Sequence, residues 1–260
     1  MKIGLIGGGA IGCYVAAELA ARGLGPEAVL TRSGPEHARG SDGVLRLRRL
    51  EDLPEGITLM VDCAGHAALA EHGAAILERG IDLITVSLGA LADPALAERL
   101  AEAAERGGAQ LHLASGAIGA LDALAAARVG GLASVTYVGR KPPRGWQGSP
   151  AEEKLDLARL DQAATHFEGS AREAAQRYPK NANVAAAVAF AGIGFDATQV
   201  RLVADPGVME NIHEIHAEGA FGTLSFRING KPLPDNPRSS ALAAMSAVAA
   251  IERRCVPITI

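Results

Sequence analysis

The chain has 260 residues, of which 48% are hydrophobic and 3% aromatic, and its formal net charge is −4. The apolar content suffices for a core of Ala, Leu, Val and Ile, and the length allows one large domain or two of ordinary size. Without a basic run the chain is not expected to bind nucleic acid, and no apolar stretch reaches the roughly 20 residues that span a bilayer.

Three cysteines, Cys13, Cys63 and Cys255, are scattered along the chain without CxxC spacing. No signal-peptide pattern precedes the first predicted strand. Structural thiols in a reduced compartment fit this pattern. We therefore expect a cytoplasmic protein.

The first predicted element is a buried strand over residues 3–6, which leads directly into Gly7-x-Gly9-x-x-Gly12 and an Ala/Leu-rich helix over 10–21. A strand, a glycine turn and a helix in this order form the dinucleotide-binding fingerprint. Its glycines allow a tight turn, close approach of a pyrophosphate and helix–strand packing, and the helix amides face the phosphates. A plain glycine-rich turn is the alternative. We expect the coenzyme, NAD or NADP, to contact Gly7, Gly9, Ala10, Ile11 and Gly12.

The second strand is predicted over Glu27–Thr31, before a polar loop or broken helix over residues 33–43. In an NAD-binding unit this strand usually ends in a carboxylate that binds the ribose hydroxyls. Here it ends in Leu30-Thr31-Arg32-Ser33. Arg32 could hold the 2′-phosphate of NADP by charge-assisted hydrogen bonds, although it could also be a solvated loop charge. We expect NADP to be accepted at least as readily as NAD.

Strands and helices then alternate, with strands predicted over 59–64, 82–87 and 110–114 and helices over 67–79 and 94–106. This alternation predicts a parallel sheet covered on both faces. Ligands of such sheets bind beyond the carboxyl ends of the strands, where this chain has small residues. The alternative is that these glycines only turn the chain. We expect Ala64 and Gly65 to contact the coenzyme and His66 the substrate.

The pattern changes near residue 134. A half-exposed strand over 134–140 and a Pro/Gly/Trp loop over 141–150 precede predicted helices over 151–164, 171–177 and 184–191. Strands follow over 199–204, 211–217 and 221–228, and a last helix over 239–253. The predicted fold class is therefore α/β, with a Rossmann-type domain over 1–133 and an α+β domain with a mixed or antiparallel sheet over 134–238. The last helix is expected to pack back on the first domain.

Two histidines, His213 and His216, lie in one predicted strand. Because side chains alternate along a strand, only one of them can face a given cleft, and spacing does not say which. A single strand histidine is usually structural. The pair points to opposite faces, and no Cys or carboxylate cluster completes a zinc site, so no metal is expected. No GxSxG elbow supports nucleophilic hydrolysis.

The sequence resembles the L-aspartate dehydrogenase family over essentially its whole length. Apart from the glycine fingerprint, the matching motifs are not generic to nucleotide-binding domains. They are Asp62-Cys-Ala-Gly-His66, Val86-Ser-Leu-Gly-Ala90, Ser115-Gly-Ala-Ile-Gly-Ala-Leu-Asp-Ala-Leu124, Val138-Gly-Arg-Lys-Pro142, Phe167-Glu-Gly-Ser-Ala-Arg172, Tyr178-Pro-Lys-Asn-Ala-Asn-Val184, Asn211-Ile-His-Glu-Ile215 and Gly219-Ala-Phe-Gly222.

The resemblance implies NAD- or NADP-dependent oxidation of L-aspartate to iminoaspartate, which hydrolyses to oxaloacetate and ammonia or feeds quinolinate and NAD synthesis, and the reverse amination. It implies that His213 is the catalytic residue, and it makes His216 structural. Ala117 and Asn183 become coenzyme contacts, although Asn183 could be no more than a helix N-cap. His213, with a pKa near the working range, could move protons for the amine or for the water that attacks the imine.

The two carboxylates of aspartate need cationic or amide partners. We favour Lys180 because it lies in the Tyr-Pro-Lys-Asn motif, with a solvated surface lysine as the alternative. The cations in or near the matched motifs are Arg140, Lys141, Arg144, Arg172, Arg177 and Lys180.

Two other functions remain open from the residues alone. One is a different amino-acid or semialdehyde dehydrogenase or reductase of the same two-domain plan, and the other is a non-catalytic NAD(P)H-sensing protein. The second domain distinguishes them, because the Lys-Asn-Ala-Asn and Asn-Ile-His motifs favour the aspartate enzyme. A second domain with an exposed sheet also often dimerises, and we expect a homodimer.

Overall fold

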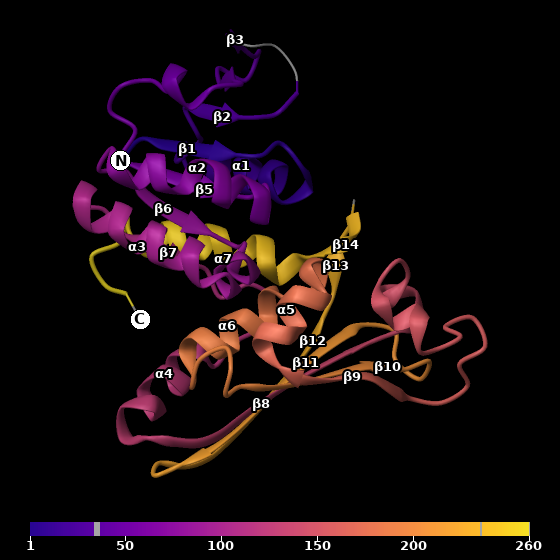
Figure 1. Ribbon diagram of the computed structural model, residues 1–260. Helices are drawn as coiled ribbons and strands as arrows, with labels where there is room; N and C mark the ends of the chain where they lie inside the picture. The colour runs from indigo at the N-terminus through magenta and orange to yellow at the C-terminus, as the bar shows by residue number, and fades with distance from the viewer. Residues whose placement is uncertain (34–36, 235, 260) are drawn as a thin grey trace. The chain divides into compact units, whose positions relative to one another are not determined.

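The computed structural model describes residues 1–33, 37–234 and 236–259, without the side chains of Lys180, Pro237 and Arg238. The chain forms two compact units, Met1–Gly116 with Ala243–Ile260, and Ala117–Leu242 (Figure 1). The sequence-based boundary after residue 133 falls inside a strand of the second unit. Helix α4 (Leu121–Gly130) belongs to that unit because it packs on α6 (Asn183–Ala191), where Arg128 Nη1 donates to the Phe190 carbonyl at 3.0 Å.

The first unit is built on a seven-stranded sheet in the order β3-β4-β2-β1-β5-β6-β7. In this order, all neighbouring strands from β4 through β2, β1, β5 and β6 to β7 are parallel, and β3 is antiparallel to β4. This order is that of a dinucleotide-binding sheet, so the predicted Rossmann-type domain is confirmed. The strands are β1 (Ile3–Ile6), β2 (Ala28–Leu30), β3 (His37–Arg39), β4 (Leu45–Leu47), β5 (Leu59–Asp62), β6 (Asp82–Thr85) and β7 (Leu111–Leu113).

Helices cover both faces of this sheet. On one face, the buried apolar side chains of β1 and β5 pack against α1 (Ala10–Ala21) and α7 (Ala241–Glu252), with Val15, Val248 and Ile251 in a single cluster. On the other face lie α2 (His66–Glu78) and α3 (Pro94–Gly107), which pack against each other. The expected return of the last helix to this unit is therefore seen in its core contacts.

Local sequence explains the best-defined helix ends. The Asp93 side chain accepts a hydrogen bond from Ala95 N at 3.0 Å, and Pro94 occupies the first turn of α3. Both are favourable because the first amides of a helix have no partner inside it. In the second unit, Ser170 and Glu173 form a reciprocal capping box at the start of α5 (Ala171–Arg177).

The region over 33–43, predicted as a loop or broken helix, instead contains β3, which pairs with β4. Residues 34–36 lie outside the described part. The alternation in this hairpin is too short to mark it, since each strand has only three residues. Short 3₁₀ turns η1 (Leu50–Asp52) and η2 (Leu88–Ala92) complete the first unit.

The second unit contains a mixed five-stranded sheet in the order β12-β11-β8-β10-β9. Only β8 and β10 are parallel, and the other neighbours are antiparallel. Helices α5 and α6 lie against this sheet (Figure 1). The strands are β8 (Leu132–Lys141), β9 (Ala164–Ser170), β10 (Gln199–Ala204), β11 (Asn211–Gly219) and β12 (Gly222–Gly230), and a separate hairpin joins β13 (Pro232–Leu233) to β14 (Asn236–Ser240).

The helix predicted over 151–164 is wrong. That segment begins with the single turn η4 (Pro150–Glu153) and then runs irregularly into β9. The Asp156 side chain accepts from Ala158 N at 3.2 Å, and such a local turn competes with helix formation. The preceding loop contains η3 (Pro143–Trp146), whose buried Trp146 donates from Nε1 to the Val203 carbonyl at 3.0 Å.

Among the described residues, none of the helices combines the length and the apolar character needed to cross a bilayer.

Candidate active site

The turn between β1 and α1 has the form of a phosphate cradle. Gly7 has a φ of +98°, and a Cβ at Gly12 would lie 2.1 Å from the Gly7 carbonyl oxygen. A Cβ at Gly9 would instead meet nothing within 4 Å, so the backbone there faces open space. Gly9 is also the N-cap of α1, and the first amides of a helix have no partner within it. A pyrophosphate fits these donors, which include Ala10, Ile11 and Gly12.

The end of β2 presents hydroxyl and guanidinium groups. Thr31 Oγ1 donates to the Ser33 carbonyl at 2.8 Å, which fixes the turn, and Arg32 is exposed beside it. Glu27, the nearest carboxylate before this turn, lies 3.7 Å from Lys2 Nζ. Glu36 lies outside the described residues. The described turn therefore presents an exposed cation at the position predicted to meet the coenzyme ribose.

A buried carboxylate organises the ends of β5 and β6. Asp62, fully buried, accepts hydrogen bonds from Thr85 Oγ1 at 2.7 Å, from Ser87 Oγ at 2.6 Å and from Ala64 N at 2.9 Å. Burial raises the pKa of Asp62, and these hydrogen bonds act against that rise. We did not predict this role from the sequence, although Asp62 ends an otherwise apolar strand. The network fixes the loop that follows β5.

That loop carries three of the predicted site residues. Ala64 is exposed, and Gly65, with a φ of +98°, is the N-cap of α2. His66 is the first residue of α2 and is partly buried. All three stand beyond the carboxyl end of a central strand, where ligands of such sheets bind.

The predicted catalytic histidine lies on β11 in the second unit. His213 is 5% exposed, whereas His216, on the opposite face of the strand, is exposed. Tyr137 OH and His213 Nδ1 lie 2.8 Å apart. Among the described residues, Nε2 of His213 has no hydrogen-bond partner. The imidazole is thus held through one nitrogen and offers the other for proton transfer.

The absence of a side chain at Gly139 leaves room for the contact between Tyr137 and His213. Gly139 is the cross-strand partner of His213 in the β8–β11 ladder, and a Cβ there would lie only 2.7 Å from Tyr137 OH. Burial raises the pKa of the Tyr137 phenol, which therefore stays protonated at neutral pH. Sequence reasoning missed Tyr137, because contacts between side chains of neighbouring strands have no fixed spacing along the chain.

The charge state of His213 differs from the expected one. Burial, helped by the nearby ammonium of Lys141, lowers the pKa of His213 to about 3. The expected value in the working range therefore does not hold for the protein alone. The imidazole is neutral at pH 7, so one ring nitrogen keeps its proton and the other can accept one.

Lys141 lies on the same face of β8 as Tyr137 and Gly139, since side chains alternate along a strand. Its Nζ donates to Asn181 Oδ1 and lies 4.8 Å from the ring centroid of Trp146. Burial lowers the pKa of Lys141 to about 8. No carboxylate among the described residues pairs with it.

The other cations proposed for the substrate carboxylates are differently placed. Arg140 Nη1 lies 2.6 Å from Asp205 Oδ2, and Arg172 is paired with Asp196 at 2.6 and 2.8 Å. Arg144 and Arg177 are exposed. Lys180 lies in η5 (Pro179–Asn181), and its side chain lies outside the described part of the chain.

The two remaining coenzyme candidates also belong to the second unit. Ala117 is buried, and Asn183 is the partly buried first residue of α6. The N-cap of α6 is Ala182, so the alternative role of Asn183 as an N-cap does not apply.

A second buried histidine lies near this site. His166 Nδ1 is 3.0 Å from Tyr178 OH, and its ring lies edge-on to Trp146 with centroids 4.4 Å apart. Burial, with contributions from Lys154 and Lys141, lowers the pKa of His166 to about 4. This histidine is neutral at pH 7 and packs as part of an aromatic cluster.

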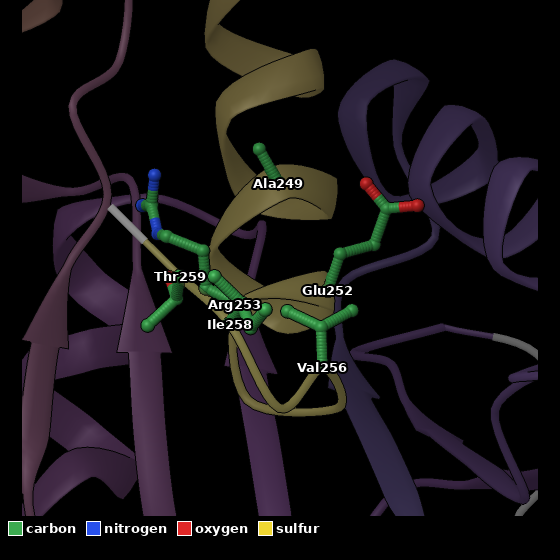
Figure 2. A pocket seen from close by; sticks show the side chains of 6 residues that line it. All are labelled: Ala249, Glu252, Arg253, Val256, Ile258 and Thr259. Carbon is green, nitrogen blue, oxygen red and sulfur yellow. The ribbon is translucent and has the colours of Figure 1, made fainter.

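In the described part of the chain, no three His, Cys, Asp or Glu side chains are grouped to hold a metal ion. A hollow of about 290 Å³ lies beside α7, and Figure 2 shows the side chains that line it. None of the candidate site residues lines it. Its lining residues are Ala249, Glu252, Arg253, Val256, Ile258 and Thr259.

Two family models match this chain, one in each half. Residues 122–254 match the family model described as aspartate dehydrogenase, C-terminal. Residues 7–114 match the model described as homoserine dehydrogenase, NAD binding domain. The second match covers the glycine turn and the strand ends, and the first covers His213.

Similar proteins share both halves. The L-aspartate dehydrogenase of Ruegeria pomeroyi is 56% identical over 255 residues, which cover 98% of this chain and 92% of the relative. That of Pseudomonas aeruginosa is 53% identical and covers 82% of this chain and 80% of the relative. The crystal structure of aspartate dehydrogenase from Thermotoga maritima matches with a TM-score of 0.77 and 28% identity, covering 100% of this chain and 99% of that one.

Proposed function

The chain belongs to the L-aspartate dehydrogenase family, and we propose that it oxidises L-aspartate to iminoaspartate with a nicotinamide coenzyme and catalyses the reverse amination. Iminoaspartate then hydrolyses to oxaloacetate and ammonia. The observation that carries the proposal is a buried histidine, held by Tyr137 and adjacent to a lysine without a carboxylate partner, in a chain that also has a coenzyme-binding glycine turn.

When bound, the coenzyme supplies the acceptor for the hydride that leaves Cα of aspartate. The residues present fit it, because Gly9 faces open space and the α1 amides are free to donate. We assign the pyrophosphate to the turn over Gly7–Gly12. The Asp62 network would hold the loop at Ala64 and Gly65 rigid against the coenzyme, and Ala117 and Asn183 are proposed as further contacts.

We propose that Arg32 favours NADP. Its exposed guanidinium follows β2, where an NAD-specific unit would carry a carboxylate, and it can bind a 2′-phosphate with two parallel hydrogen bonds. NAD remains a possible coenzyme, since the glycine turn does not distinguish the two.

His213 is proposed to move the proton. The substrate amine must be neutral before its lone pair can form the C=N bond, and Nε2 of a neutral imidazole can accept the proton that the ammonium loses. The same atom could take a proton from the water that attacks the imine. Burial is the main cause of the lowered pKa of His213 and the ammonium of Lys141 is a smaller one, so an anionic substrate near Lys141 would raise that pKa.

For the substrate, Lys180 and His66 remain proposed contacts from sequence reasoning. A homodimer, a cytoplasmic location and a role in NAD biosynthesis are further proposals. The family resemblance supports the last of these. Cys13, Cys63 and Cys255 are free thiols, which supports a reducing compartment. Strand β12 lies at the edge of its sheet, and such an edge strand can pair with a second copy of the chain, which supports the homodimer.

The experiment that tests the function is a spectrophotometric assay of reduced coenzyme with L-aspartate, L-homoserine and L-glutamate, each with NAD and with NADP. L-Homoserine is included because the first half of the chain matches the coenzyme-binding domain of its dehydrogenase. Turnover of L-aspartate well above the other two supports the proposal. Preference for another amino acid, or coenzyme binding without any turnover, would reject it.

A further inference from the structure

Lys141 is a cation in a position that folding alone does not explain. It lies at the end of β8, partly buried, with its Nζ against Asn181 Oδ1 and the face of Trp146. A desolvated ammonium is costly unless an anion compensates it. The described residues provide only a neutral amide and an aromatic ring.

Two cations of the matched motifs have their anions within the fold. Arg140, the preceding residue, is paired with Asp205, and Arg172 with Asp196. Lys141 differs from both, because no carboxylate among the described residues pairs with it. Its charge is also felt by two buried histidines, because it contributes to the lowered pKa of both His213 and His166.

The ammonium of Lys141 has N–H groups that make no hydrogen bond within the described part of the chain. A lysine carries three N–H groups, and the contact with Asn181 uses one of them. The register of the sheet directs Lys141 to the same face as His213, since Gly139, two positions earlier on β8, is the cross-strand partner of that histidine. The remaining donors thus belong to the face of the sheet that carries the proposed proton acceptor, whose pKa the ammonium helps to lower.

We propose that Lys141 binds one of the two carboxylates of the substrate, and that Asn181 positions its ammonium for this contact. The inference rests on the proposed function for the identity of the dicarboxylate. The proposal assigns a substrate-binding role to Lys141 of the Val-Gly-Arg-Lys-Pro motif. The hydrogen bond from Lys141 to Asn181 links this motif to the Tyr-Pro-Lys-Asn motif.

The test compares Lys141→Met, Lys141→Arg and Asn181→Asp with wild type, with Lys231→Met at an exposed lysine of the same unit as the matched control. Lys141→Met should raise KM for L-aspartate by about 10- to 100-fold, the usual effect of losing a hydrogen bond to a charged group. KM for the coenzyme should change less than twofold, and Lys141→Arg should restore part of the loss.

Asn181→Asp separates substrate binding from a structural role. It places a carboxylate on the ammonium, which should then compete with the substrate and raise KM for L-aspartate while strengthening the contact between the two residues. If Lys141 only ties β8 to η5, this variant should keep a normal KM, and that result would overturn the proposal.

Binding of succinate, followed by calorimetry, gives a readout that needs no turnover. Wild type and Lys231→Met should bind succinate, and Lys141→Met should bind it at least about tenfold more weakly. If L-aspartate is not oxidised but succinate binding still depends on Lys141, the function is wrong and the carboxylate site stands. Equal succinate binding by wild type and Lys141→Met would reject the site, whatever the enzyme oxidises.

Discussion

Replacing Tyr137 with Phe removes a single hydroxyl from the second unit. Tyr137 and His213 are 2% and 5% exposed, and the hydroxyl lies 2.8 Å from Nδ1. The ring keeps its place in the sheet, but Nδ1 loses its partner away from water. Leaving a buried polar group unpaired costs about 1–3 kcal/mol. If the activation free energy rises by the same amount, kcat falls by about 5- to 150-fold.

The assay is steady-state oxidation of L-aspartate at saturating coenzyme, together with thermal melting of each variant. We expect kcat to fall and KM for the coenzyme to stay within twofold, because Tyr137 acts through His213 and has no proposed coenzyme contact. The pH profile of kcat should shift as well, since the hydrogen bond acts on the nitrogen opposite the proton acceptor. A merely structural tyrosine would not move that profile.

A variant with lower melting temperature but unchanged kcat and pH profile would refute this reasoning. It would show that the tyrosine stabilises the sheet and that His213 keeps its orientation without it.

Three further predictions concern the coenzyme site and acid stability. Gly12→Ala should raise the Kd for reduced coenzyme by about 5- to 150-fold in a fluorescence titration, because its Cβ would lie 2.1 Å from the Gly7 carbonyl oxygen and relieving such a clash costs about 1–3 kcal/mol. A Kd within twofold of wild type would contradict this. Arg32→Asp should lower the ratio of kcat/KM for NADP to that for NAD by about 10- to 100-fold, through loss of a hydrogen bond to a charged group; an unchanged ratio would remove Arg32 from the site. Because the folded pKa of His166 is about 4 and the ordinary value is about 6.5, the unfolded chain takes up its proton first. Through His166 alone, the free energy of unfolding should therefore fall by up to about 3 kcal/mol as the pH drops from 6.5 toward 4, and His213, whose pKa is also lowered, should add to this fall. Urea titrations should show a smaller fall for His166→Gln, and an equal fall would contradict the assignment.

The pattern of the first half could be predicted because each element there is specified locally. An apolar strand, a glycine turn and a helix have fixed spacings, and α3 begins at Pro94, the first residue of the predicted helix over 94–106. The segment over 151–164 shows where such reasoning fails. The spacing of its apolar residues favours a helix, but local turns such as that at Asp156 compete with helix formation. The residues of β9 are extended because they pair with β10, and this pairing cannot be read from local spacing.

The candidate site shows the same limit. The Asn-Ile-His motif identified His213, but its partner Tyr137 and the open position at Gly139 depend on the register between β8 and β11. The sequence favoured Lys180 for the substrate and gave Lys141 only as one of several cations in the matched motifs. Lys141 is identified as a candidate by its burial and by the absence of a carboxylate partner among the described side chains. Charge compensation is a property of the fold, so sequence spacing could not reveal it.

The most direct measurement of the central claim is kcat for L-aspartate oxidation in His213→Asn, with His216→Asn as the matched control on the exposed face of the same strand. Loss of a general acid–base group should lower kcat by about 10²- to 10⁴-fold, and the control should keep wild-type activity. Full activity in His213→Asn, or an equal loss in both variants, would contradict the account.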